Sequence, residues 1–165
     1  IKHTNYVLIS GYVSILFGRS RGTEDVDIII PKLSFENFLV IHNNLINYGY
    51  WSLNSDNSRT IYELLNTNSI RYAKKNNVIP NMEIKTEKNK LDRIALHNKI
   101  KIEFANKIVY ISPIELQIAF KELLLSSSKD IEDALHLREI FKDKLDLNKL
   151  NTYINDCEDE KKRIC

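Results

Sequence analysis

The chain has 165 residues, of which 43% are hydrophobic and 28% are charged, the balance of one globular domain or of a small core with a helical appendage. Its formal net charge of +2 is too small to indicate nucleic-acid or membrane binding by itself. We find no signal-peptide pattern and no apolar run long enough to span a bilayer, and two late cysteines make neither a disulfide framework nor a metal site, so we expect a cytoplasmic protein.

The chain begins at Ile1 rather than Met, so we expect that it has been trimmed and that a leading helix could be missing. The first elements expected are a short strand or turn, two helical turns between glycines, a polar loop and a mostly buried strand. They are expected at residues 6–10, 11–18, 19–24 and 25–30, respectively. Pro31 ends the strand.

A helix is expected over residues 35–48, because Ser34 is a good N-cap and Gly49 suits a left-handed C-terminal cap. Its apolar face is formed by Phe38, Ile41, Leu45 and Tyr48. The segments that follow are expected to be a strand, a short helix or strand, a strand and a longer strand, at residues 50–53, 59–65, 70–73 and 78–86.

The last part of the chain begins with a short helix or connector and a hairpin, expected at residues 87–98, 100–104 and 107–112. Ser112, Pro113 and Glu115 then combine an N-cap, a proline at the first helical position and a capping-box acid. This helix is expected to end near residue 125. Further helices are expected from residue 127 or 128, and from about residue 146 on an apolar face of Leu147, Leu150 and Ile154, with a solvated tail at residues 156–163.

The order of the elements, mixed strands and helices first and helices alone afterwards, predicts an α+β fold. We expect a small mixed sheet flanked by helices in an α/β core at residues 1–112. Residues 113–165 are expected to form a helical segment packed on that core.

Two acids on the first buried strand suggest metal chemistry. Asp25 and Asp27 are two residues apart, so both side chains leave the same face of a strand. Two carboxylates this close repel each other, and a cation between them removes the penalty. Mg²⁺ prefers such hard oxygen ligands together with phosphate oxygens, and Mn²⁺ is the alternative ion.

The segment before these acids suits a phosphate. Ser10 and Gly11 begin a short helix whose free backbone N–H groups favour anions. Arg19 and Arg21 could clamp phosphate oxygens, and Thr23 could hydrogen-bond either the loop or a phosphate. For Arg21 and Thr23, stabilisation of the loop itself is an equally good interpretation.

Residues 10–30 resemble the polymerase-beta-like nucleotidyltransferase superfamily, in particular its small prokaryotic branch with abortive-infection and antitoxin-linked proteins. That branch has a Gly-Gly or Gly-Ser pair, a later Gly, and then Arg-x-Thr-x-Asp-hydrophobic-Asp. These positions are filled here by Ser10, Gly11, Gly18, Arg21, Thr23, Asp25 and Asp27. Ser10 is a departure, because the first position of the pair is usually Gly.

The resemblance implies a third carboxylate on a later strand. Glu83 is the best match, on a strand-like segment with Glu83 and Lys85 on one face and Met82 and Ile84 on the other. The family more often has Asp there, and Glu103 is the rival. Residues 111–137 also resemble the family's C-terminal pattern, whose matching positions are Lys121, Lys129, Asp130 and Asp133. Lys121 could reach the triphosphate, whereas Asp130 is better explained by a helix start and salt bridges between helices.

The resemblance implies a metal-dependent nucleotidyltransferase, in which Asp25, Asp27 and Glu83 hold the ion and a nucleoside triphosphate transfers its nucleotidyl group to a hydroxyl. A small drug-like alcohol, a protein side chain and an RNA end are all compatible acceptors. The alternative hypothesis is a nucleotide- or partner-binding module without turnover, one half of a toxin–antitoxin or phage-defence pair. A plain structural domain is a third, weaker option.

Overall fold

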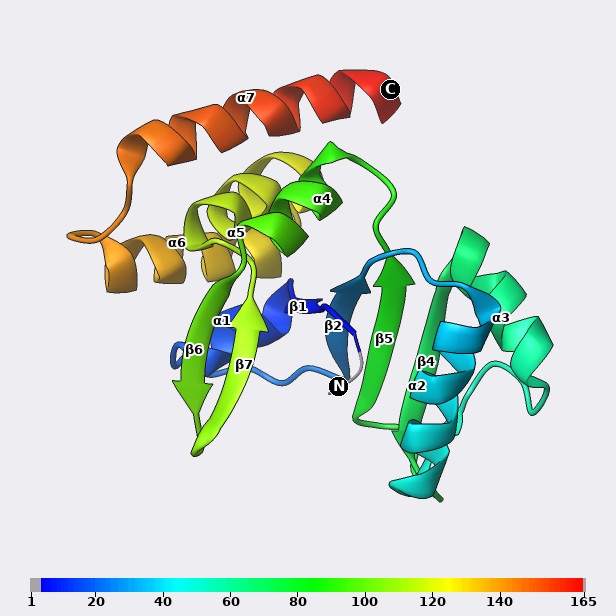
Figure 1. Ribbon diagram of the computed structural model, residues 1–165. Helices are drawn as coiled ribbons and strands as arrows, with labels where there is room; N and C mark the ends of the chain where they lie inside the picture. The colour runs from blue at the N-terminus through cyan, green and yellow to red at the C-terminus, as the bar shows by residue number, and fades with distance from the viewer. Residues whose placement is uncertain (1–3, 165) are drawn as a thin grey trace.

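The fold is built on one mixed β-sheet. The structure is a computed structural model that describes residues 4–164. In this part of the chain the sheet has seven strands in the order β3-β4-β5-β2-β1-β7-β6 (Figure 1). The strands are β1 (Val7–Leu8), β2 (Asp25–Ile30), β3 (Tyr50–Ser52), β4 (Ser69–Lys74), β5 (Asn81–Thr86), β6 (Ile100–Phe104) and β7 (Lys107–Ile111).

The centre of the sheet is the parallel pair β2 and β5. Their register places Asp27 opposite Glu83 and Ile28 opposite Ile84. Strands β1 and β7 are also parallel, and the other neighbours run antiparallel. A parallel pair needs a crossover, and here β3 and β4 lie within it, so the crossover extends the sheet at the same time.

Helices α2 (Phe35–Asn47) and α3 (Ser58–Thr67) cover one face of the sheet beside β4 and β5 (Figure 1). Ile30 and Ile84 point to this face, where they lie with Phe38 of α2 and Leu65 of α3 in the core. Because side chains alternate along a strand, Asp27 points to the opposite face. The buried face therefore fixes the direction of the acidic one.

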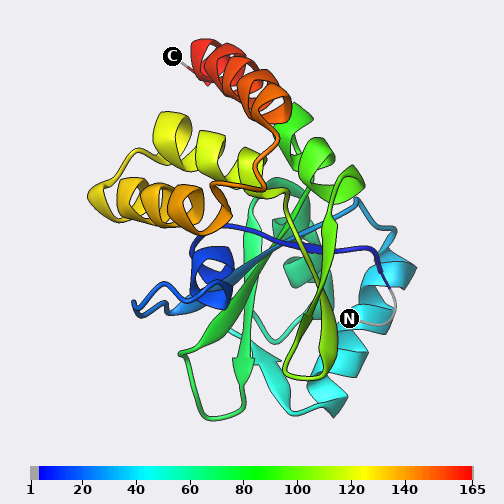
Figure 2. The same ribbon diagram turned by 90° about the vertical axis from the view of Figure 1, so that its left-hand side faces the viewer.

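The remaining helices gather on the other side of the molecule. They are α1 (Gly11–Leu16), α4 (Lys90–His97), α5 (Ile114–Phe120), which continues as the π-helical turn η1 (Lys121–Leu125), α6 (Ser128–Phe141) and α7 (Leu147–Ile164). Helix α5 packs against α6 and α7, and α1 packs against α6 (Figure 2). Within residues 4–164, no helix has the length and apolar character needed to cross a bilayer.

Local signals predicted most of these elements, and the α+β fold is confirmed. Ser34 caps α2 by accepting a hydrogen bond from the backbone N–H of Asn37 at 3.3 Å. Residues 58–67 are a helix, and the strand expected at 78–86 begins only at Asn81. The division of the chain at residue 112 remains a prediction, and it falls in the connection between β7 and α5.

The expected capping box at α5 is wrong. Pro113, not Ser112, occupies the N-cap position, and the helix begins at Ile114. The Ser112 hydroxyl is buried and has no hydrogen-bond partner within residues 4–164. Glu115 instead accepts a hydrogen bond from the backbone N–H of Asp146 at 3.1 Å, so this acid anchors the start of α7.

The expectation of a solvated tail at residues 156–163 is confirmed for one side of this segment only, since five of its eight residues are exposed. Helix α7 continues to Ile164, and Cys157 on it is fully buried. Burial raises the pKa of the Cys157 thiol to about 12. The buried face of α7 contains Leu150, Tyr153 and Cys157, whereas Leu147 is 65% exposed. The many charges of this segment lie on the opposite face of an amphipathic helix. Composition alone had suggested that the whole segment is solvated.

Candidate active site

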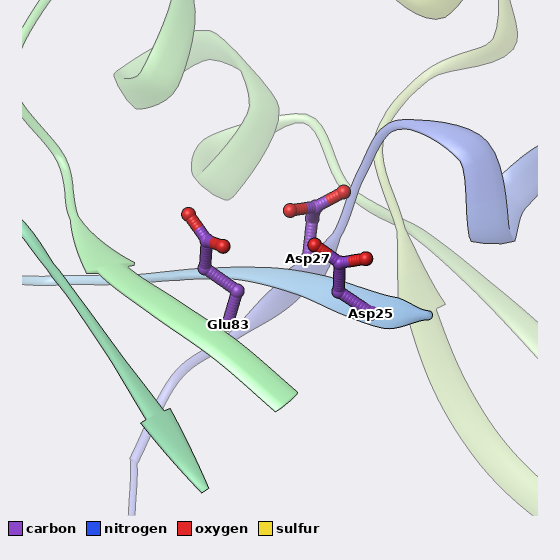
Figure 3. Close-up of side chains that lie close together, drawn as sticks. All are labelled: Asp25, Asp27 and Glu83. Carbon is purple, nitrogen blue, oxygen red and sulfur yellow. The ribbon is translucent and has the colours of Figure 1, made fainter. Parts of the chain in front are cut away.

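Three carboxylates meet on the face of the sheet opposite α2 and α3. Asp25 and Asp27 project from β2, and Glu83 projects from β5 beside Asp27 (Figure 3). One oxygen of each carboxylate lies within 4.8 Å of the others. Each side chain is half-buried, so the group is held by the sheet and still open to solvent. The structure thus brings Glu83 to the aspartate pair, while the rival Glu103 lies exposed on edge strand β6.

These residues fit a divalent cation. A six-coordinate Mg²⁺ places its ligand oxygens roughly 3–4 Å apart, so small side-chain rotations would close the cluster around one ion. The pKa of Asp27 is raised, first by burial and then by the charges of Glu83 and Asp25, while a hydrogen bond from Ser10 works in the opposite direction. A cation would relieve the repulsion that raises it.

Glu83 also has partners inside the protein. Its Oε1 accepts a hydrogen bond from Ser69 Oγ at 2.8 Å, and its Oε2 accepts one from Arg71 Nε at 2.8 Å. Burial alone would raise the pKa of Glu83, but the hydrogen bonds from Arg71 and Ser69 outweigh it and lower the pKa. Glu83 is therefore charged and oriented before any ion binds. A metal ion would have to share this carboxylate with the Arg71 guanidinium.

Ser10 takes a backbone conformation that suits glycine. Its φ of 64° and ψ of −143° are unfavourable for a residue with a Cβ. The backbone N–H of Ser10 donates to Oε1 of Gln117 on α5 at 3.1 Å. This conformation accounts for the glycine that the related motif usually has at this position, and it shows that Ser10 is held in a strained turn next to Asp27.

Gly11 is required by a close contact with Arg21. A Cβ on Gly11 would lie 1.9 Å from Nη2 of Arg21. The arginine has little freedom to move away, because the same nitrogen donates to Asp133 Oδ2 at 2.9 Å. Gly18 has a φ of 90° directly after α1, which is also a glycine conformation. Both glycines thus shape the loop that leads to β2.

A buried charge cluster joins this loop to the C-terminal helices. Lys121 and Asp133 are both fully buried and form an ion pair of 2.8 Å, and Asp130 accepts from Lys121 at 3.4 Å. Arg19 contributes through an ion pair with Glu132 and lies 3.6 Å from Asp133. The structure therefore directs these basic groups toward acids of α6. Their expected contacts with a nucleotide remain predictions.

Two further predicted residues have simple local contacts. Thr23 Oγ1 donates to the backbone carbonyl of Asp25 at 3.0 Å, which is the loop-stabilising alternative. Asp130 lies in the first turn of α6, where the N-cap residue Ser127 hydrogen-bonds both its backbone N–H and its carboxylate. Asp130 therefore serves the helix start and the ion pair with Lys121, as the sequence analysis favoured.

Sequence reasoning missed three polar residues of the site. Arg71 and Ser69 reach Glu83 from the neighbouring strand β4, and Gln117 reaches Ser10 from α5. The sequence predicted strand β4, but the register that sets Arg71 opposite Glu83 depends on the irregular connection between the strands. Gln117 carries no motif signal, because it lies 107 residues from its partner.

A cavity of about 230 Å³ lies beside Asp27 and Glu83. Helices α4 and α5 cover it with the apolar side chains of Leu91, Ala95, Leu116 and Phe120. Its polar lining includes Ser10, Ser112 and an ion pair of 3.2 Å between Lys85 and Asp92. The acids therefore lie at the edge of a half-open, mainly apolar cavity.

Comparison with known proteins supports this architecture. The sequence matches no family model and no curated protein. Among solved structures, it is similar to an antigenic nucleotidyltransferase-like protein from Paracoccidioides brasiliensis, with a TM-score of 0.51 and 14% identity over 96% of this chain and 81% of that one. The chain has a nucleotidyltransferase-like fold. At this identity the likeness concerns the fold, and it places a group of three acids within a nucleotidyltransferase-like sheet.

Proposed function

We propose that the protein is a metal-dependent nucleotidyltransferase, which moves a nucleoside monophosphate from a nucleoside triphosphate to an acceptor hydroxyl. The observation that carries the proposal is the convergence of Asp25, Asp27 and Glu83 on adjacent parallel strands. Three hard oxygen donors in a half-buried, like-charged group suit Mg²⁺ or Mn²⁺. The nucleotidyltransferase-like fold favours nucleotide chemistry over other uses of such a group.

In this reaction the acceptor oxygen attacks the α-phosphorus and the bond from the α-phosphorus to the bridging oxygen of the β-phosphate breaks, so pyrophosphate leaves. Mg²⁺ or Mn²⁺ bound by the three acids would neutralise charge on the phosphate oxygens. Asp25 and Asp27 act as ion ligands, fixed by a strand whose other face is in the core. Glu83 either binds a second ion or takes the proton of the acceptor hydroxyl.

We propose the remaining nucleotide contacts from the sequence motif. Ser10, Gly11 and Arg21 would hold the outgoing phosphates. Because Lys121 is fully buried against Asp133, it would act through the position of α6 unless that pair opens. The further motif positions proposed for the nucleotide are Gly18, Arg19 and Thr23. The motif also favours the small abortive-infection and antitoxin-linked branch of the superfamily.

The test is transfer of label from α-labelled ATP, GTP, CTP or UTP, in the presence of Mg²⁺ or Mn²⁺, to a panel of alcohols, protein hydroxyls and RNA ends. We expect transfer with at least one pair of substrates. The double variant Asp25→Asn/Asp27→Asn should lose it by roughly a hundredfold or more. Glu103→Gln, an exposed acid on β6, is the matched control and should keep full activity. Equal signals from the wild type and the double variant would sink the proposal.

A second candidate is a nucleotide- or partner-binding module without turnover, within a toxin–antitoxin or phage-defence pair. The ion pair of Glu83 with Arg71 favours it, because an acid held by an arginine is less available to an ion or a proton. Calorimetry separates the two candidates. Nucleotide binding that is unaffected by Glu83→Gln and yields no product would support the binding module.

A further inference from the structure

The cavity beside the acids is too small for a whole nucleotide. An apolar cavity of about 150 Å³ holds one benzene molecule, and pockets for drug-sized ligands start near 300 Å³. The volume here is about 230 Å³. It therefore fits a single ring with a few substituents, whereas a triphosphate or the end of an RNA chain would extend out of it.

One polar group of the cavity wall lacks a partner. Ser112 is 1% exposed, and its hydroxyl makes no hydrogen bond within residues 4–164. Buried hydroxyls in native proteins are nearly always satisfied, and an unsatisfied one costs about 1–3 kcal/mol. Because Ser112 lines the cavity, a polar substituent of a ligand could supply the missing hydrogen bond.

The charges around the cavity select against anions. Lys85 is paired with Asp92 at 3.2 Å, so its charge is already balanced. Glu83 is likewise paired with Arg71. The excess negative charge at the edge of this mainly apolar space therefore comes from Asp27, with Asp25 beside it. A carboxylate or phosphate would be repelled there, while an uncharged or positively charged group would not.

The order of the strands shows on which side of Asp25 and Asp27 the cavity extends. Strand β1, which leads to Gly11, flanks β2 on one side, and β5 with Glu83 flanks it on the other. If the outgoing phosphates lie on the side of Gly11, in-line attack requires the acceptor to approach from the side of Glu83. The cavity extends there, toward Lys85 and Leu91. Its other end reaches Ser10 beside the proposed phosphate position, but neither Gly11 nor Arg21 lines it.

We propose that this cavity binds the acceptor, and that the acceptor is a compact, uncharged or positively charged alcohol. The inference rests on the proposed nucleotidyl transfer. The ring packs against Leu91, Leu116 and Phe120, a second polar substituent hydrogen-bonds Ser112, and the reacting hydroxyl faces Glu83. Its proton passes to a carboxylate oxygen of Glu83, its oxygen bonds to the α-phosphorus, and the electron pair of the broken bond leaves with pyrophosphate.

The probes for the test are benzyl alcohol, cyclohexane-1,2-diol and the anion benzoate, added to the full chain and followed by ligand-detected NMR and by titration. We expect the two alcohols to bind at millimolar concentration and benzoate to bind at least roughly tenfold more weakly. Binding of the alcohols should persist when a non-hydrolysable ATP analogue and Mn²⁺ are present. Adenosine should not displace them, because the cavity is assigned to the acceptor and not to the base.

Matched serines provide the control. Ser112→Ala should weaken binding of the diol roughly fivefold, the value of one hydrogen bond. Ser14 is equally buried and equally lacks a partner within the described residues, but it does not line the cavity. Ser14→Ala should therefore leave diol binding unchanged. Ala95→Leu should fill part of the cavity and abolish alcohol binding while Mn²⁺ still binds at the acids.

The outcomes distinguish this inference from the proposed function. Alcohols that fail to bind, or that bind equally well to Ser112→Ala and Ala95→Leu, overturn the acceptor cavity even if labelled nucleotide is transferred elsewhere. Displacement by adenosine also overturns it and assigns the cavity to the nucleobase. Loss of transfer activity in every condition, with alcohols bound as expected, would count against the proposed reaction and not against the cavity.

Discussion

The protein uses acids in two contrasting ways. At the site of Asp25, Asp27 and Glu83, three carboxylates are half-buried and share one strong basic partner, Arg71. In the cluster between the loop and the C-terminal helices, Asp133 is fully buried and every oxygen lies near a lysine or an arginine. The first group carries unbalanced negative charge that a ligand can neutralise. The second is neutralised by the protein itself, and so it ties distant segments together.

The largest expected effect is on stability, at the buried cluster. Asp133→Asn leaves Lys121 as a buried, poorly compensated charge, so we expect unfolding to become easier by about 3 kcal/mol in urea titration. Asp25→Asn should leave stability equal or higher, because it removes repulsion at the open site. A comparable loss from both single variants would contradict the contrast between the two groups.

The strained turn between the two regions predicts a smaller gain in stability. Ser10 has a φ of 64°, so Ser10→Gly should relieve strain and stabilise the protein by about 1 kcal/mol. Ser14→Gly, in the interior of α1, should destabilise by a similar amount, because glycine weakens a helix. Thermal or urea unfolding of both variants checks the prediction, and the same sign for both would contradict it.

Replacement of Arg71 tests how much of the negative charge of the three carboxylates this arginine neutralises. Arg71→Met removes one positive charge next to Glu83, so Mn²⁺ should bind more tightly by roughly fivefold at low salt. Paramagnetic relaxation of water protons measures this affinity. Arg59→Met is the control, because Arg59 pairs with Glu63 on the surface of α3, away from the acids. Unchanged Mn²⁺ affinity in Arg71→Met would show that Glu83 is not among the ligands.

The pH dependence of ion binding gives the smallest of these effects. Burial, with the charges of Glu83 and Asp25, raises the pKa of Asp27 above its ordinary value of 3.8. A protonated carboxyl group binds Mn²⁺ poorly, so affinity should fall as the pH decreases through this raised pKa. A raised pKa in the folded state also means that Asp27 stabilises the ion-free protein at low pH, and that this contribution is lost as the pH rises. A Mn²⁺ titration between pH 4 and 8 in which the affinity follows an ordinary Asp would contradict the assignment.

Local patterns predicted the elements whose stability is local. Strand β2, the cap at Ser34 and the hairpin of β6 and β7 follow from periodicity and capping chemistry, and the structure has them where they were expected. Asp25 and Asp27 could be placed together because two residues of one strand share a face. Glu83 came from the resemblance, supported by its polar position on a predicted strand.

Long-range contacts could not be predicted in this way. Asp133 is 112 residues from Arg21 in the sequence. No local pattern predicts that this arginine forms an ion pair with an acid of α6 instead of being free for a phosphate. The capping role predicted for Ser112 was wrong, because the tertiary fold buries its hydroxyl away from the first turn of α5. The charged segment after Asn155 was expected to be solvated because of its composition. The burial of Cys157 depends on the helices against which α7 packs, and no local pattern shows those contacts.

The crossover between the two central strands separates the site from most of the intervening chain. Residues 31–80 leave β2 after its last residue and return at the start of its parallel neighbour. The distance between Asp27 and Glu83 is set by the ladder of β2 and β5, not by the length of this excursion. Insertions beside the exposed Asp56, between β3 and α3, should therefore leave the acids in place. This part of the chain can vary in length and surface while the acids keep their positions. Its direct contribution to the site is the set of hydrogen bonds that Arg71 and Ser69 donate to Glu83.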